Sequence, residues 1–315
     1  MHIGNWVRSV DDKLSRFPIQ KALLFLAGSV CITLVVAFSS YAIYGSFKRK
    51  KLTSDRYKIE GLVQTGPEKE ALKTVYLAEL LGLSSDGSKN LYSLDLKKAE
   101  MALLSSPLIA KAKVKRLPPN TIYVDYEVRR PLAWISDYRN TAIDAEGYLF
   151  PIAPFLSPKE MPEIYLGLPK FEAEEDSFGR TGGRWRTPLQ NRYLDLAFHL
   201  LRTFEGSPWR EGLRIKRIDV SNAFAPSLGR REIVLITEEE ISLKKGEREI
   251  SFTFPKILRL ASKDWNQQLQ NFFALRRNMI EDYKKQLSLS EEGGHFSPRI
   301  VDLRVPQLAF VENQS

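Results

Sequence analysis

The chain has 315 residues, a formal net charge of +9 and a single cysteine. This length allows one membrane anchor and one or two soluble domains, each with its own core. Residues 1–51 hold eight Lys/Arg against two Asp, whereas the remaining 264 residues carry 39 basic and 36 acidic side chains. The positive charge is therefore concentrated near the N-terminus and not on the folded part, which argues against a nucleic-acid-binding protein.

The first element in chain order is an uncharged run at residues 22–47, followed at once by the basic residues 48–51. About 20 apolar residues suffice for a helix to cross the hydrocarbon core of a bilayer. Tyr41, Tyr44 and Phe47 gather at the far end of the run, as aromatic residues do at membrane interfaces. We therefore predict one uncleaved transmembrane helix, with a cleaved secretory signal as the alternative.

Basic residues flank both ends of this run, and they leave its orientation open. Four Lys/Arg precede the run and six lie at residues 48–58. Counted this way, the positive-inside rule slightly favours a cytoplasmic C-terminal part. The same flanks favour contact with anionic lipid headgroups, so membrane lipid is an expected partner. The single cysteine, Cys31, lies inside the run, and no intrachain disulfide is possible.

Residues 56–130 show the element order β-α-α-β-β. Residues 57–63 are typical of a short strand, and a helix is predicted from Thr65, which has an early proline and a glutamate three positions later. A second helix is predicted from about Asp95, with Leu96, Ala99 and Leu103 on one face. Alternation predicts a hairpin at residues 112–128. This order is typical of a compact α+β module with its helices on one face of a small sheet. Ala71, Val75, Ala78 and Leu81 follow at helical spacing in the first helix, and Gly82 suits its C-terminal cap.

Residues 131–315 are predicted to form a strand-rich β domain with flanking helices. Two short strands meet at the turn Glu146–Gly147. An amphipathic helix follows Pro188, and its buried side is expected to contain Leu194, Ala197, Phe198 and Leu201. Residues 213–254 suggest three or four strands, and Glu238-Glu239-Glu240 is interpreted as a turn between two of them. A long helix from about residue 255 to 287 and a last strand pair at 300–305 and 308–311 complete the domain. An exposed loop is expected at residues 169–187.

The search for catalytic chemistry is negative. His199 is interpreted as a helix-packing residue, and His295 has no nearby Cys or His with which to bind a metal. The sequence has no Gly-rich phosphate loop, no metalloprotease helix motif and no nucleophile elbow. The acidic residues at 172–176 are interpreted as a solvated loop. We therefore expect a protein that is not an enzyme and needs no cofactor.

The last strand pair suggests a binding function instead. In residues 300–305, apolar side chains alternate with Asp302 and Arg304, and Pro306 cannot donate a hydrogen bond to a sheet ladder. This composition predicts an edge strand, which either accepts a partner segment by strand addition or is an ordinary last strand with a proline that blocks aggregation.

These pieces together resemble the FtsQ/DivIB family of bacterial cell-division proteins. The resemblance covers a short tail, one anchor, a β-α-α-β-β module of the POTRA type and a strand-rich C-terminal domain. It implies the boundaries 1–21, 22–47, 48–55, 56–130 and 131–315 for tail, anchor, linker, POTRA domain and β domain. The motifs that carry it are IEGLV at 59–63, NLYSLD at 90–95, AKVKRLPPNTI at 112–122, RPLA at 130–133, DAEG at 144–147 and VDLR at 301–304.

The resemblance implies a divisome scaffold in the inner membrane at the septum, with residues 1–21 in the cytoplasm and the folded domains outside. Such a scaffold holds the bitopic coiled-coil proteins FtsB/DivIC and FtsL and thereby influences septal peptidoglycan synthesis. The POTRA module is expected to contact other division proteins. A membrane-anchored cell-wall hydrolase or another periplasmic enzyme is the alternative function. The dock for FtsB falls on the last strand, where the expected contact residues are Arg304, Val305, Leu308 and Phe310.

Overall fold

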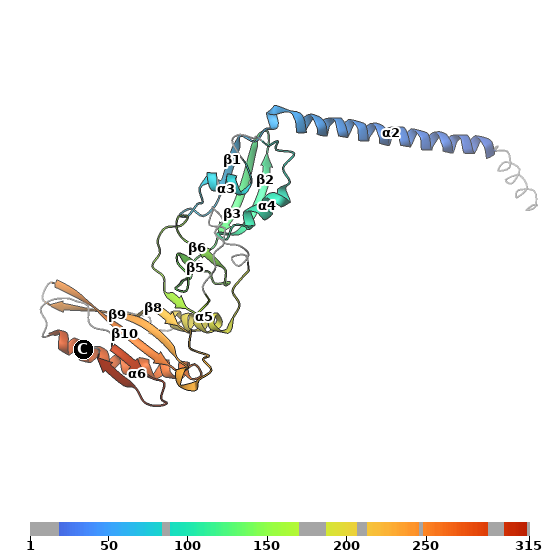
Figure 1. The fold of residues 1–315 in the computed structure, drawn as a ribbon. Helices are drawn as coiled ribbons and strands as arrows, with labels where there is room; N and C mark the ends of the chain where they lie inside the picture. Colours follow the sequence, from blue (N-terminus) through green and yellow to red (C-terminus); the bar gives the residue numbers. More distant parts are fainter. Residues whose placement is uncertain are drawn as a thin grey trace, which may run out of the picture. The chain divides into compact units, whose positions relative to one another are not determined.

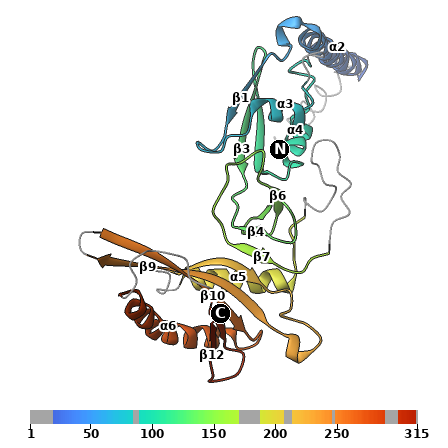
Figure 2. The ribbon, with the colours of Figure 1, turned by 60° about the vertical axis from the view of Figure 1, so that its left-hand side comes forward.

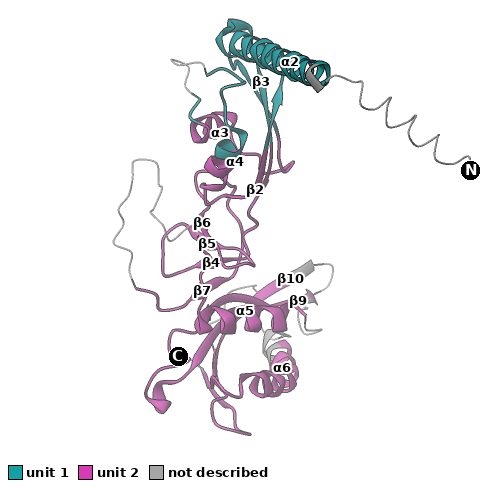
Figure 3. Cartoon of the chain, turned by 90° about the vertical axis from the view of Figure 1, so that its right-hand side faces the viewer, with its two compact units in different colours: residues 1–64, 82–99, 114–124 teal, residues 65–81, 100–113, 125–315 magenta. Residues whose placement is uncertain are grey.

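The structure is a computed structural model of mixed α+β type (Figure 1). It describes residues 19–83, 89–169, 187–206, 213–245, 248–288 and 299–313. Contacts divide the chain into two units, coloured separately in Figure 3. Unit 1 comprises residues 1–64, 82–99 and 114–124, and unit 2 comprises residues 65–81, 100–113 and 125–315.

The first described element, α2 (Ile19–Thr53), is one continuous helix of 35 residues. Within the described residues it is the one helix that is long and apolar enough to cross a membrane, and none of its apolar window is buried. At 1.5 Å per residue, its length of about 52 Å exceeds the about 30 Å of a hydrocarbon core. The helix extends beyond residue 47, the predicted end of the anchor, and includes residues 48–53 of the segment 48–55 that was expected to be a linker.

The predicted β-α-α-β-β order is confirmed after this helix. A single helical turn η1 (Asp55–Tyr57) precedes a three-stranded sheet with the strand order β1-β3-β2. The elements, in chain order, are β1 (Gly61–Thr65), α3 (Thr74–Leu80), α4 (Leu96–Leu104), β2 (Ile109–Leu117) and β3 (Thr121–Val128).

The first helix of this module differs from its prediction. Thr65 ends strand β1, and α3 begins nine residues later, after Lys73, which makes no side-chain cap. Of the residues expected at helical spacing, Leu81 is buried but Val75 is exposed. The other buried side chains of this segment are Leu72 and Leu77. The helix begins nine residues later than predicted and has only two turns, so its buried side chains differ from those expected. Its end was predicted correctly, since Gly82 has a φ of +61°.

The rest of the module was predicted well. The Asp95 carboxylate accepts hydrogen bonds from the backbone N–H groups of Lys97 at 3.0 Å and Lys98 at 3.2 Å, which caps α4. Ala99 and Leu103 are buried on that helix, as expected. The hairpin buries alternate residues of β3, namely Ile122, Val124 and Tyr126.

Tyr126 offers a test of this core. Its hydroxyl accepts a buried 2.8 Å hydrogen bond from the backbone N–H of Leu72, and burial raises the pKa of the phenol while that bond opposes the rise. We expect Tyr126→Phe to lower the free energy of unfolding by about 1–2 kcal/mol, because the buried N–H loses this acceptor. Denaturant unfolding of the detergent-solubilised chain measures the change. Tyr165→Phe, at an exposed position, is the control; an equal loss there would contradict the prediction.

The second sheet has nine strands in the order β12-β11-β10-β9-β8-β7-β4-β5-β6. Two helices, α5 (Arg192–Glu205) and α6 (Trp265–Ser288), and the single turn η4 (Leu228–Arg230) accompany it. The strands are β4 (Ala133–Ile135), β5 (Thr141–Ile143), β6 (Leu149–Pro151), β7 (Glu163–Tyr165), β8 (Leu213–Asp219), β9 (Ile233–Lys245), β10 (Arg248–Leu260), β11 (Arg299–Asp302) and β12 (Phe310–Asn313).

Most elements of this domain agree with the sequence. The turn between β5 and β6 contains Gly147 with a φ of +91°. Helix α5 begins after Asn191, whose side chain accepts a 2.8 Å hydrogen bond from the N–H of Leu194. The predicted loop 169–187 falls almost entirely outside the described residues, as do His2, His295 and residues 172–176. The buried face of α5 contains the expected Leu194, Ala197, Phe198 and Leu201.

The predicted start of the last long helix was wrong. Residues 255–260 belong to strand β10, and α6 starts only at Trp265. Along β10 every second residue from Phe252 to Leu260 is buried, so the two-residue period of a strand continues. Lys256 occupies one of those buried positions. Because a charged residue interrupts the apolar alternation there, the sequence pattern does not indicate a strand.

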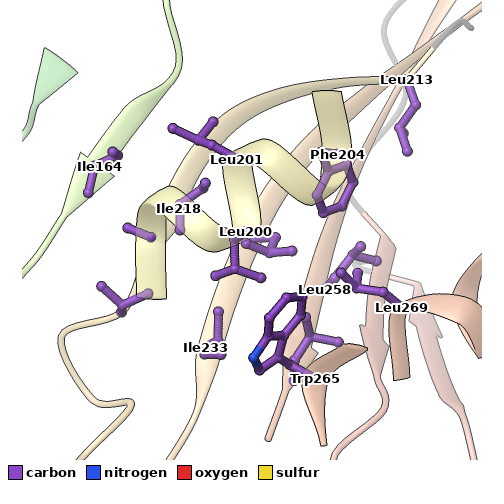
Figure 4. Close-up of a cluster of buried hydrophobic side chains, with 14 of the residues drawn as sticks. Ile164, Leu200, Leu201, Phe204, Leu213, Ile218, Ile233, Leu258, Trp265 and Leu269 are labelled. Atoms are coloured by element: carbon purple, nitrogen blue, oxygen red, sulfur yellow. The ribbon is translucent and has the colours of Figure 1, made fainter. Parts of the chain in front are cut away.

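Helices α5 and α6 share one face of the nine-stranded sheet, and α6 lies along β10 (Figure 2). Their side chains meet the sheet residues in a single apolar core, part of which Figure 4 shows. His199 packs edge to face on Trp265 with ring centroids 5.2 Å apart, and Phe204 meets Phe273 at 5.9 Å. His199 therefore packs on a neighbouring ring, as predicted, although it occupies an exposed position of α5.

A buried ion cluster lies within this core. Residues 238–240, interpreted above as a turn, are in the middle of β9, and that interpretation was wrong. Glu239 is 1% exposed; one carboxylate oxygen contacts the Lys256 ammonium, and the other accepts a 2.7 Å hydrogen bond from Arg276 Nε on α6. Burial lowers the pKa of Lys256, and the Glu239 carboxylate opposes that shift. The cluster therefore connects α6 to strands β9 and β10.

Candidate functional site

The candidate docking site is the strand pair β11–β12 at one end of the nine-stranded sheet. Strand β11 runs parallel to β10, with Ile300 beside Ile257, and its other side pairs with β12, where Val301 lies opposite Val311. The expectation that residues 300–305 form the edge was therefore wrong, because α6 carries the chain back to lay β11 inside the sheet. Among the described residues β12 pairs only with β11, and it is the edge strand.

The turn between β11 and β12 has a defined geometry. Its start is held by Leu303, which is buried and donates its N–H to the Arg259 carbonyl at 2.9 Å. The Leu308 N–H bonds the Val305 carbonyl at 3.2 Å, and Gln307 adopts a φ of +63°. Positive φ is uncommon outside glycine and marks a tight turn. The turn thus presents its residues in a fixed arrangement.

Arg304 belongs to a network of four charged side chains. Its guanidinium donates to Asp302 at 2.7 Å and to Glu232 at 3.2 Å. Arg259 in turn donates to Glu232 at 2.6 Å and lies 3.7 Å from Asp302. Two cations and two anions alternate, so the network links β10, β11 and the turn. Arg304 is therefore occupied within the chain, and its geometry indicates a role in supporting the turn.

Asp302 makes this network sensitive to acid. Burial alone would raise the pKa of Asp302, but the hydrogen bonds and charge of Arg304, with help from Arg259, hold it below the ordinary value of 3.8. A carboxylate with a lowered pKa stabilises the folded state above its unfolded pKa, and this contribution is lost as the pH falls through the folded pKa. Asp302→Asn removes this titrating group. As the pH falls below 3.8, we therefore expect the free energy of unfolding to decrease less in the variant than in the parent, as measured by denaturation at several pH values. An unchanged acid dependence would contradict the prediction.

Four apolar side chains are exposed at the turn and on β12. Val305 is 44% exposed, Leu308 56%, Phe310 57% and Val311 47%. Val305 and Leu308 thus lie in the turn and Phe310 at the start of the edge strand, and all three are exposed. Val311, which was not predicted, follows Phe310 in β12 and points to the opposite face of the strand.

A cavity of about 1,120 Å³ lies elsewhere in unit 2, beside β8. Charged residues at its wall pair with each other: Lys216 with Glu238 at 3.2 Å, and Arg214 with Glu240 at 3.1 Å. No group of three or more His, Cys, Asp or Glu side chains that could hold a metal ion occurs within the described ranges. The strand edge, with its unpaired side and exposed apolar residues, is therefore the better candidate site, and its chemistry is that of binding.

The comparison with known families concerns the POTRA-type module. Residues 69–125 match the family model of the POTRA domain, FtsQ-type. The match covers α3, α4, β2 and most of β3. No curated protein matches the chain. A POTRA domain indicates protein–protein interaction, the FtsQ type suggests a role in cell division, and helix α2 suggests a membrane anchor. The chain therefore carries a POTRA domain of the FtsQ type at residues 69–125.

Proposed function

We propose that the protein is a non-catalytic, membrane-anchored scaffold of the bacterial division machinery. The observation that carries this proposal is the FtsQ-type POTRA domain directly after an apolar helix of 35 residues. In this proposal α2 spans the inner membrane once at the division site. Residues 1–21 lie in the cytoplasm, and the folded domains lie outside it.

The partners in this proposal are FtsB/DivIC-like and FtsL-like bitopic proteins. A partner segment adds to the free edge of β12, where main-chain hydrogen bonds supply affinity and side-chain contacts supply specificity. Val305, Leu308 and Phe310 form the apolar part of the contact, and Arg304 holds the turn that presents them. The POTRA domain contacts further division proteins.

Two measurements on the full chain test the proposal. The first is a topology reporter fused at the C-terminus; a reporter active only in the cytoplasm would overturn the orientation, and the scaffold assignment with it. The second is co-purification of the anchored protein with a co-expressed FtsB/DivIC-like partner, for which we expect stoichiometric capture. Turnover of purified peptidoglycan without such capture would favour the cell-wall hydrolase instead.

A further inference from the structure

The C-terminal end of α2 is fastened to a distant segment of unit 1. The last carbonyl groups of a helix have no partner within the helix. Here the side-chain amide of Asn90 donates to the Lys51 carbonyl at 2.9 Å and approaches the Ser54 carbonyl at 3.5 Å. The ammonium of Lys51 also lies 5.0 Å from the centroid of the Tyr92 ring. The helix end is therefore capped by residues that follow it by about 40 positions.

Backbone hydrogen bonds reinforce this connection. The N–H of Leu91 bonds the Tyr57 carbonyl at 2.7 Å, and the N–H of Ile59 bonds the Lys89 carbonyl at 2.9 Å. The rings of Tyr57 and Tyr92 pack edge to face with centroids 5.0 Å apart. We call residues 48–59 and 89–92 the junction. Its contacts hold the end of α2 against the rest of unit 1, without a free linker after the helix.

The sequence of α2 fixes the depth of the junction if the helix spans a bilayer. Tyr41, Tyr44 and Phe47 are exposed, and such aromatic residues mark the interface between hydrocarbon and headgroups. The basic residues 48–51 follow at once and are all exposed. At about 100° per residue, four consecutive helical residues span about 300° of the circumference. Cations therefore surround the helix at the level of the headgroups.

The junction also carries an excess of positive charge. Residues 48–59 contain six Lys/Arg and one acidic residue, Asp55, and Glu60 follows directly after them. Asp55 pairs with Lys58 at 2.7 Å, and Glu60 accepts a hydrogen bond from Asn120 at 2.7 Å. Lys89 on the neighbouring segment is exposed and adds another cation. The phosphate groups of anionic phospholipids complement this charge.

We propose that the junction rests on the bilayer surface and binds anionic phospholipid headgroups, so that the POTRA domain starts directly at the membrane. This inference rests on the proposed membrane anchor. It gives the basic residues after the anchor a binding function in the leaflet that faces the folded domains. The surface is continuous with the anchor, and its charge matches that leaflet.

Fluorescence quenching in lipid nanodiscs tests the proposal. The full chain, with Cys31→Ser and Lys89→Cys, carries a fluorophore at position 89, and the discs contain a lipid with a nitroxide on its headgroup. We expect strong quenching in discs with phosphatidylglycerol, weaker quenching in pure phosphatidylcholine, and a decrease as salt is added. Equal quenching in the two lipids would overturn the proposal.

Two pairs of substitutions that remove the same charge provide the matched comparison. Lys50→Gln/Lys51→Gln should lower the ratio of docked to undocked junction by about fivefold per cation. Lys97→Gln/Lys98→Gln, at exposed positions on α4, should leave it unchanged. Asn90→Ala should lower quenching without any change in charge. Equal effects of the two pairs would overturn the inference.

The proposed function fails separately from this inference. Loss of the chain from the discs would show that α2 is not an anchor, and both proposals would then be wrong. A chain that stays in the discs and captures its bitopic partner, but shows no lipid-dependent quenching, would overturn the headgroup contact alone.

Discussion

We expect Glu239→Ala to lower the free energy of unfolding by about 3–5 kcal/mol, because it removes the buried carboxylate that pairs with both Lys256 and Arg276. Lys256 is 0% exposed and would keep its ammonium in the core, or lose its proton to avoid that cost. Arg276 cannot deprotonate in this way and would have to leave the sheet. The change should therefore loosen α6 as well as destabilise the sheet.

The neighbouring residue provides a control on the same strand. Glu240 faces the opposite side of β9, and its ion pair with Arg214 at 3.1 Å is largely exposed. Exposed pairs contribute about 0–1 kcal/mol, so Glu240→Ala should have a small effect. Denaturant unfolding followed by circular dichroism measures both variants. Similar losses for the two glutamates would contradict the role assigned to the buried cluster.

The sequence could not reveal this cluster, for a physical reason. Three consecutive glutamates are typical of a solvated turn, and a lysine within residues 255–260 interrupts the apolar alternation of a strand. Glu239 and Lys256 are compatible with a buried core because they pair with each other and because Arg276, 37 residues after Glu239, also binds the Glu239 carboxylate. Propensity describes local preference, whereas the compensation here comes from a tertiary contact.

Elements whose start and buried face are both marked by nearby residues in the sequence were predicted correctly. Helix α5 has a polar N-cap and a long apolar stripe, and the hairpin β2–β3 alternates over its whole length, so both were predicted from the sequence. Helix α3 has only two turns and no side-chain cap, and its start was missed. The edge position of β12 depends on the parallel return through α6, which strand composition does not encode.

The largest effect on binding should follow Val305→Asp/Leu308→Asp at the proposed dock. The two side chains are 44% and 56% exposed, so they contribute little to the core but are available to a partner. Apolar residues at the centre of an interface each cost about 2 kcal/mol or more when lost, and a buried carboxylate costs more. We therefore expect affinity for the bitopic partner to fall by at least about 100-fold.

The control for this variant is Leu228→Asp, because Leu228 is 76% exposed in η4 and outside the proposed dock. Both changes should leave the free energy of unfolding within about 0.5 kcal/mol of the parent, as expected for surface substitutions. Partner capture and denaturant unfolding, measured on the same preparations, separate a lost contact from a damaged fold. Retained binding in Val305→Asp/Leu308→Asp would exclude the turn and the β12 edge as the dock. Lost binding with intact stability would leave a direct contact with these side chains as the explanation, since the buried residues Val301 and Leu303 still hold β11 in the sheet.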